Sequence, residues 1–208
     1  MSNVKLVWAT PCAEDLIAHM ARVSNPKSQE NPENSDRLIR YLIKHQHWSP
    51  FEMVNICMEI KTTRDIARQI LRHRSFSFQE FSQRYAEAVD FDYSEARLQD
   101  LKNRQASIET DNELLQTDWQ TSQEHVLETA LRIYKGALQA GIAKEVARKV
   151  LPEGLTLSTM YMNGTLRSWI HYVQLRCGPE TQKEHREVAE QIKEVLNTLC
   201  PVVMKSLI

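Results

Sequence analysis

The segment from Arg72 to Arg84 constrains this chain most, because it joins dense positive charge to aromatic side chains. Its thirteen residues hold three arginines, a histidine and three serines but a single acid. Guanidinium groups bind phosphates and carboxylates through paired hydrogen bonds, so such a cluster needs either an anion or full hydration. Three interleaved phenylalanines argue against a merely hydrated surface. The segment therefore predicts a folded site that binds anions.

Positive charge is concentrated here rather than spread over the chain. Residues 61–84 carry six lysine and arginine side chains against two acids, whereas the whole chain of 208 residues has a net charge of −1. Local charge in a nearly neutral protein favours a small anion site over a broad nucleic-acid footprint. The alternative is a nucleic-acid-binding module, in which the arginines grip phosphates and the phenylalanines stack on bases. Glu80 inside the segment and the net charge argue against that alternative.

Composition and length indicate one globular domain over residues 1–208, with 42% of residues hydrophobic and 25% charged. No apolar run approaches the roughly 20 residues that span a bilayer, and the N-terminus lacks a secretory apolar stretch. The four cysteines form no C-x-x-C pair, so we expect reduced, buried thiols rather than zinc or disulfide sites. These features predict a cytoplasmic protein, in the host cytoplasm if it is viral, without a membrane partner.

Hydrophobic periodicity predicts a helix-rich α/β (α+β) domain with few strands. Strands are expected at 5–10, 54–60 and 155–162, and an extended segment at 75–85. Helices are expected at 12–22, 64–73 after a Thr63 cap, 117–140, 142–149 and 165–176, with others from a Ser35 cap and from a capping box at Thr181 to Leu199. Loops are expected up to Asn34 and over 90–116, and a turn at Asn163-Gly164.

A series of short motifs runs in order from about residue 21 to residue 176. The central one is Arg72-His73-Arg74 followed by Ser77, Glu80, Ser82, Arg84 and Tyr85. The flanking ones are Ala21-Arg22-Val23-Ser24, His47-x-Ser49-Pro50-Phe51-Glu52, Arg68-Gln69, Glu145-Val146-Ala147-Arg148, Leu151-Pro152, Asn163 to Arg167 and Leu175-Arg176. This ordered set resembles the signature of the flavin-dependent thymidylate synthases, R-H-R-x-x-S-x-N-E-x-S-x-R-Y, with Gln79 in place of the usual Asn.

The resemblance implies reductive methylation of dUMP to dTMP. The methylene would come from 5,10-methylenetetrahydrofolate, FAD would carry the reducing equivalents, and NADPH would supply them, so the partners are a nucleotide, a folate and a nicotinamide cofactor. The family lacks a cysteine nucleophile on uracil C6, and no cysteine lies in the matched motifs. The implied fold is a single helix-rich domain with a small, mostly antiparallel sheet, assembled as a homotetramer whose active sites draw on more than one subunit.

The resemblance also implies which residues form the site. The dUMP contacts would be Gln69, Ile70, Leu71, Arg72, Glu80, Phe81, Ser82, Gln83, Arg84, Arg148 and Arg176. The FAD contacts would be Ser49, Arg72, His73, Arg74, Glu80, Thr165, Leu166, Arg167 and His171, with His47 adjacent to folate or flavin. Arg176 would be catalytic, because a guanidinium beside the uracil carbonyl edge stabilises negative charge and makes C5 more nucleophilic.

Structural interpretations compete at several positions. His45 and His47 form an H-x-H pair without a spaced third ligand, so no metal is expected. Arg64 and Arg68 are expected on an exposed helix face, paired with Asp65, Glu59 or Glu52. The phenylalanines of the basic segment are expected in the core or at a subunit interface, and His185 is expected to be a solvated helix residue. A flavin-binding relative without turnover is a further alternative to the active enzyme.

Overall fold

A four-stranded sheet organises the fold, and the computed structural model describes residues 2–29, 33–87 and 90–207. The strands lie in the order β1 (Asn3–Ala9), β2 (Asn55–Thr63), β6 (Leu157–Thr165) and β3 (Ser77–Glu80), and each neighbouring pair is antiparallel. The expected small antiparallel sheet in a helix-rich chain is confirmed. The basic motif therefore ends on an edge strand, β3, which pairs only with β6 among the described residues.

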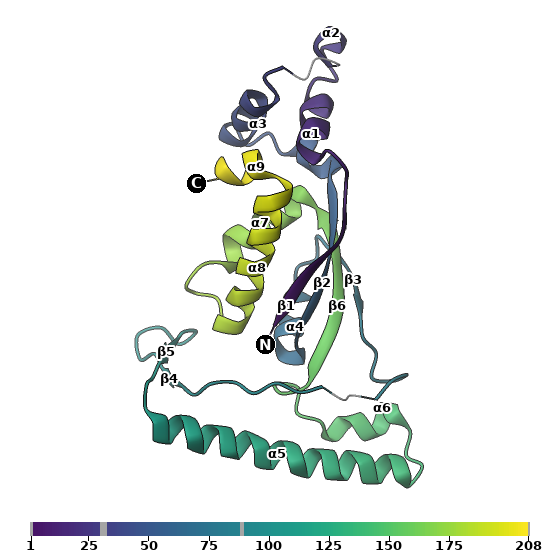
Figure 1. The fold of residues 1–208 in the computed structure, drawn as a ribbon, viewed down its shortest axis with the longest axis vertical. Helices are drawn as coiled ribbons and strands as arrows, with labels where there is room; N and C mark the ends of the chain where they lie inside the picture. The colour runs from purple at the N-terminus through teal and green to yellow at the C-terminus, as the bar shows by residue number, and fades with distance from the viewer. Residues whose placement is uncertain (1, 30–32, 88–89, 208) are drawn as a thin grey trace.

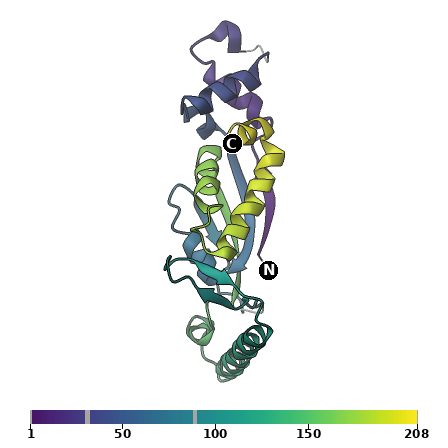
Figure 2. The same cartoon turned by 90° about the vertical axis from the view of Figure 1, so that its left-hand side faces the viewer.

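Two helices cover one face of this sheet, α7 (Leu166–Arg176) and α8 (Lys183–Leu199), as Figures 1 and 2 both show. Buried side chains from the sheet meet those of the helices, and Trp169 in α7 is fully buried. Its indole Nε1–H donates to the main-chain carbonyl of Ile56 in β2 over 3.1 Å, which ties helix to sheet. The short helix α4 (Arg64–Ile70) follows β2 directly and also contacts α8.

The two ends of the molecule carry the remaining elements (Figure 1). At one end lie α1 (Ala13–Ala21), α2 (Pro26–Gln29), α3 (Ser35–Lys44), the 3-10 turn η1 (Ser49–Met53) and α9 (Pro201–Lys205). At the other lie the hairpin of β4 (Arg97–Gln99) and β5 (Ser107–Glu109), the long α5 (Glu113–Gln139), α6 (Lys144–Ala147) and the 3-10 turn η2 (Arg148–Val150). Tyr134, Ala147 and Leu151 form a small second core at this end. None of the helices in the described part of the chain combines the length and the apolar sequence that a membrane span requires.

The expected turn at Asn163-Gly164 is wrong, because both residues lie inside β6. Asn163 is paired with Cys57 on one side and Ser77 on the other. A side chain at Gly164 would overlap the ring of Phe76, so the glycine allows that ring to approach the strand. Phe76 itself is buried among Trp169 and other aromatic rings, which confirms its place in the core.

Several predicted boundaries also differ. The expected loops contain α2 and the β4–β5 hairpin, and residues 30–32 lie outside the described part. The long helix begins at Glu113, because Asn112 caps it by accepting the N–H of Leu115 over 3.1 Å. The capping box at Thr181 is wrong: α8 begins at Lys183, and the Thr181 hydroxyl donates to the Leu175 carbonyl instead.

The predictions for two helix caps and for the cysteines also differ from the structure. Thr63 is the N-cap residue of α4, but its hydroxyl donates to Asp65 rather than accepting a main-chain N–H. Asn34 takes the cap position that was expected of Ser35. The four cysteines are free thiols, but Cys12 is exposed rather than buried.

Candidate active site

The turn after α4 carries the basic motif to the C-terminal end of α7. Main-chain N–H groups at Arg72 and His73 donate back into the last turn of α4, which reverses the chain there. Arg176, the last residue of α7, donates from Nε to Nε2 of His73 over 2.9 Å. The ring of His73 also meets the ring of Tyr172 edge-on, with 4.8 Å between centroids. Two motifs that lie 103 positions apart in sequence therefore touch.

His73 is neutral at physiological pH. Burial, and after it the neighbouring Arg176, His171 and Arg72, lower the pKa of His73 to about 4. A neutral imidazole that accepts at Nε2 must carry its proton on Nδ1. The contact therefore anchors the Arg176 guanidinium without neutralising it. Among the described residues, the two Nη groups of Arg176 have no hydrogen-bond or ion-pair partner, so they remain available to an anionic or carbonyl ligand.

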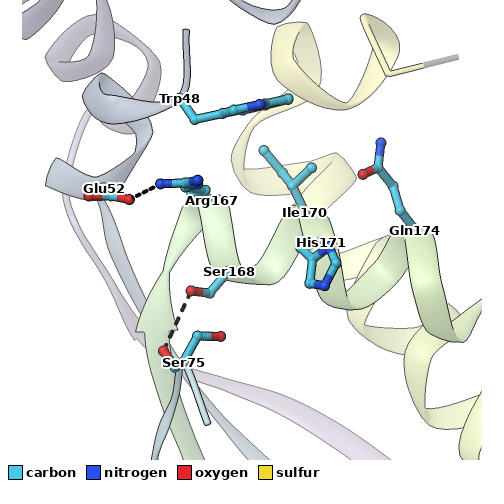
Figure 3. Close-up of a pocket in the computed structure, with 8 residues that line it drawn as sticks. All are labelled: Trp48, Glu52, Ser75, Arg167, Ser168, Ile170, His171 and Gln174. Carbon is cyan, nitrogen blue, oxygen red and sulfur yellow. Dashed lines mark hydrogen bonds and ion pairs between the residues drawn. The ribbon is translucent and has the colours of Figure 1, made fainter. Parts of the chain in front are cut away.

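A cavity of about 460 Å³ lies beside α7, within the size range of ligand pockets. Figure 3 shows its lining: Trp48, Glu52, Ser75, Arg167, Ser168, Ile170, His171 and Gln174. Arg167 forms an ion pair with Glu52, and the Ser168 hydroxyl donates to the carbonyl of Ser75 over 3.5 Å. The cavity therefore lies between Ser75, which directly follows the R-H-R motif, and one side of α7.

The predicted FAD contacts are placed unequally around this cavity. Arg167 and His171 line it, and Ser49 follows the lining residue Trp48. Thr165 instead caps α7 by accepting the N–H of Ser168 over 3.3 Å. The side chain of Leu166 is fully buried, and its main-chain N–H donates to the carbonyl of Val54. Neither its side chain nor its N–H is therefore free to contact a ligand in the cavity. His47 is exposed, and its ring lies 6.1 Å from that of His45.

Glu80 is held at the sheet edge by two neighbours. Its carboxylate accepts from the Ser158 hydroxyl over 2.8 Å and from Arg64 over 3.3 Å. The Arg64 side chain is only 12% exposed, so its expected place on an exposed face is wrong. Arg68 is exposed as expected, but its partner is Glu153, through two hydrogen bonds of 2.5 Å, rather than any of the three acids named from sequence.

Two predicted dUMP contacts, Arg84 and Arg148, lie towards the end of the molecule that carries α6. Arg84 is 3.5 Å from Glu145 of α6, and Arg148 opens the adjacent turn η2. Gln83 is 4% exposed, and its Nε2 has no hydrogen-bond partner among the described residues. Figure 1 shows α6 well separated from α7. One chain therefore places Arg84 and Arg148 in one group, and the Arg72–Arg74 turn with Arg176 in another.

Comparison with known proteins identifies the family. The family model described as "Thymidylate synthase complementing protein" matches residues 5–202. A protein of Paramecium bursaria Chlorella virus 1, named a probable flavin-dependent thymidylate synthase, is 49% identical over 94% of this chain and 90% of its own length. A flavin-dependent thymidylate synthase of Synechocystis is 50% identical over 93% and 89%. The chain belongs to the flavin-dependent thymidylate synthase family.

A solved structure with the same fold extends this assignment. A UMP/dUMP methylase of Streptomyces cacaoi, solved with 5-Br dUMP, superimposes with a TM-score of 0.86 over 99% of this chain and 94% of its own. The two sequences are 28% identical. The likeness in fold therefore covers nearly all of this chain, including the end that carries α5 and α6.

The sequence-based prediction for His185, which contacts residues near the signature motif, is wrong. His185 is fully buried rather than solvated, and it contacts both Tyr172 and the predicted substrate contact Gln69. A signal for this was present, because His185 shares a helical stripe with the buried Val188, Ala189 and Ile192. Ile70 is fully buried as well, whereas Phe81 is 38% exposed.

Proposed function

We propose that the protein converts dUMP to dTMP, with 5,10-methylenetetrahydrofolate as methylene donor, FAD as the flavin and NADPH as reductant. The contact of Arg176 with His73 of the signature motif carries the proposal, in a chain of this family. In the balanced reaction the methylene carbon replaces the proton on uracil C5. A hydride derived from NADPH completes the methyl group, and the carrier leaves as tetrahydrofolate.

The lining of the cavity beside α7 fits FAD in kind. Trp48 offers an aromatic face, and Arg167 and His171 offer hydrogen-bond donors for phosphate or for the ring edge. The side chains of Ser75 and Ser168 add hydroxyl groups that can form hydrogen bonds with the cofactor. Bound FAD would supply the two-electron transfer, which amino-acid side chains cannot perform. The chain's own task at this cavity is to hold and orient the cofactor next to the Arg72–Arg74 turn.

Arg176 activates the pyrimidine in this proposal. Its charge is held in place by a neutral histidine, and its two Nη groups have no hydrogen-bond partner among the described residues. Negative charge that develops on the uracil carbonyl edge is stabilised by such a preorganised cation, and C5 becomes more nucleophilic.

The state of the cysteines supports activation without a thiolate. Burial raises the pKa of Cys57 and Cys177, and it raises the pKa of Cys200 to about 12. These groups therefore stay protonated at neutral pH, and a protonated thiol is a poor nucleophile. Cys12 is exposed, but it precedes α1 and lies in none of the signature motifs.

Assembly into a homotetramer would complete the site in this proposal. Arg84 and Arg148 lie near α6, away from Arg176, so a second copy of the chain would bring the two groups to one nucleotide. Exposed apolar residues on α5 supply a surface for such an assembly, among them Leu114, Val126 and Ile133.

Three measurements test the proposed function. The purified protein should be yellow, and its flavin absorbance should bleach when NADPH is added without oxygen. With 5,10-methylenetetrahydrofolate, it should release tritium from 5-tritiated dUMP, and without the folate it should not. A colourless protein whose oligonucleotide affinity falls steeply with salt would favour the nucleic-acid-binding alternative. A yellow protein that never releases tritium would be the inactive flavin-binding relative.

A further inference from the structure

His185 lies at the centre of a buried polar contact that the proposed chemistry does not use. It is fully buried on α8, and both of its ring nitrogens have partners. Nε2 is 2.9 Å from the hydroxyl of Tyr172 on α7. Nδ1 is 3.2 Å from Oε1 of Gln69 on α4. The imidazole therefore bridges two helices and ends on a residue that the family resemblance assigns to dUMP.

The contact continues from Gln69 to the protein surface. Nε2 of Gln69 donates to Oε1 of Gln182 over 2.7 Å, and Nε2 of Gln182 donates to a carboxylate oxygen of Glu184 over 3.0 Å. The other carboxylate oxygen of Glu184 accepts from Arg97 over 2.5 Å. Tyr172, His185, Gln69, Gln182 and Glu184 thus form one unbroken line of hydrogen bonds, called the relay below.

The carboxylate at its end fixes the direction of the whole relay. An ionised carboxylate can only accept, so Gln182 must present its amide nitrogen to Glu184 and its oxygen to Gln69. Gln69 must then present its own nitrogen to Gln182, which leaves its oxygen for His185. His185 must carry its proton on Nδ1 to donate to that oxygen, and its bare Nε2 accepts the hydroxyl proton of Tyr172.

The protonation states required by this direction agree with the surroundings. Burial, together with the nearby positive charge of Arg176, lowers the pKa of His185 to about 3. Burial raises the pKa of Tyr172, so its hydroxyl keeps the proton that it donates. Every hydrogen bond along the relay therefore has a neutral donor, and only the last acceptor, the Glu184 carboxylate, is charged.

We propose that His185 is a positioning residue that, through the relay, holds the Gln69 amide in one orientation for the nucleotide. The inference rests on the proposed function, because it takes dUMP as the substrate and Gln69 as the dUMP contact that the family resemblance implies. After its two relay bonds, Gln69 has one N–H and one oxygen lone pair left. Their directions are fixed only while both relay neighbours hold the amide. A free amide would rotate and present donor and acceptor in exchanged places.

The test measures the Kd for dUMP by equilibrium dialysis of the flavin-loaded protein, together with KM and kcat. His185→Leu removes both ring contacts, and Gln182→Leu breaks the relay at an exposed position. Each should raise Kd and KM for dUMP about tenfold, with kcat changed less than threefold. His185→Asn places an amide nitrogen where Nδ1 was, so it should restore dUMP affinity to within threefold of wild type.

Two controls separate positioning from structural damage. Val188→Ala alters an equally buried residue one turn along α8 and should leave the Kd for dUMP unchanged. In a Gln69→Ala background, neither His185→Leu nor Gln182→Leu should raise the Kd further, because both act through Gln69. Additive effects, unchanged affinity in the two leucine variants, or an equal loss in Val188→Ala would each overturn the relay. Wild-type protein that binds no dUMP would overturn the proposed function and the relay together, whereas normal wild-type turnover with unaffected relay variants would remove the relay alone.

Discussion

Replacing Arg176 by alanine should remove most of the turnover while leaving FAD bound. The Nε–H of Arg176 donates to His73, and the two Nη groups of Arg176 form no ion pair with an acid among the described residues. The anchor is neutral, because burial lowers the pKa of His73 to about 4. The full guanidinium charge is therefore available to the uracil carbonyl edge. The residues proposed to hold FAD, such as Arg167 and His171, line a cavity that does not include Arg176.

The size of the effect follows from the number of donors lost. Removing one preorganised donor to a developing oxyanion costs roughly 3–4 kcal/mol of barrier, or about a hundredfold to a thousandfold in kcat. Arg176→Ala removes the charge as well as the donors, so kcat should fall at least a hundredfold. Arg176→Lys keeps a charge but loses the planar fork and its contact with His73, so its kcat should lie between those of wild type and Arg176→Ala.

Tritium release from 5-tritiated dUMP measures this turnover, and flavin absorbance at fixed protein concentration measures FAD occupancy. Arg40→Ala is the matched control, because the Arg40 side chain is 63% exposed and pairs with Asp36 on its own helix. That variant should keep wild-type turnover. Turnover of Arg176→Ala within threefold of wild type, at equal FAD occupancy, would refute the assignment of Arg176.

Three further predictions concern stability. Gly164→Ala should lower the free energy of unfolding, measured by chemical denaturation, by roughly 1–3 kcal/mol, because the added methyl group overlaps the Phe76 ring. Gly154→Ala is the control, because a methyl group there meets open space. Equal losses in the two variants would contradict the close packing of Phe76 on Gly164. Arg68→Ala should cost less than about 1 kcal/mol, since the Arg68 and Glu153 side chains are 58% and 46% exposed, and a larger loss in the same assay would show a stronger pair. His185 has its pKa lowered to about 3, so the unfolded chain binds that proton first as the pH falls below about 6.5. This difference should lower the free energy of unfolding by about 1.4 kcal/mol for each pH unit between pH 6 and pH 4. His185→Asn lacks the titrating group, so its free energy of unfolding should fall less steeply with pH, by about 1.4 kcal/mol per unit. Identical slopes in the two proteins would contradict a neutral, buried His185.

Local signals in the sequence predicted the elements that depend on local physics. The α7 helix begins and ends close to its predicted bounds, because Thr165 supplies a side-chain cap and the apolar stripe continues to Val173. Asn163-Gly164 misled for the opposite reason. The dipeptide is typical of turns, but pairing with strands on both sides and the approach of Phe76 hold it in β6.

The order of the motifs predicted the family, but the side-chain partners within the site needed the packed structure. Arg64 was expected to pair with nearby acids, yet it reaches Glu80 and Glu153 because α4 packs back over β6. His185 was expected in solvent, although its stripe with Val188 and Ile192 marked it as inward-facing. Helix patterns report which face is buried, whereas the partner of a buried polar group depends on how two helices cross.

In the proposed reaction a fixed guanidinium, and not a thiolate, prepares the pyrimidine. Cys12 is the exposed thiol and Cys177 is the one adjacent to Arg176, so Cys12→Ala with Cys177→Ala removes the two candidate nucleophiles that solvent or substrate could reach. The most direct measurement is tritium release from 5-tritiated dUMP by this double variant beside the wild type, with 5,10-methylenetetrahydrofolate and NADPH present. Turnover within threefold of wild type is the predicted result. Loss of turnover in a double variant that is folded and loaded with FAD would contradict activation of the pyrimidine without a thiolate.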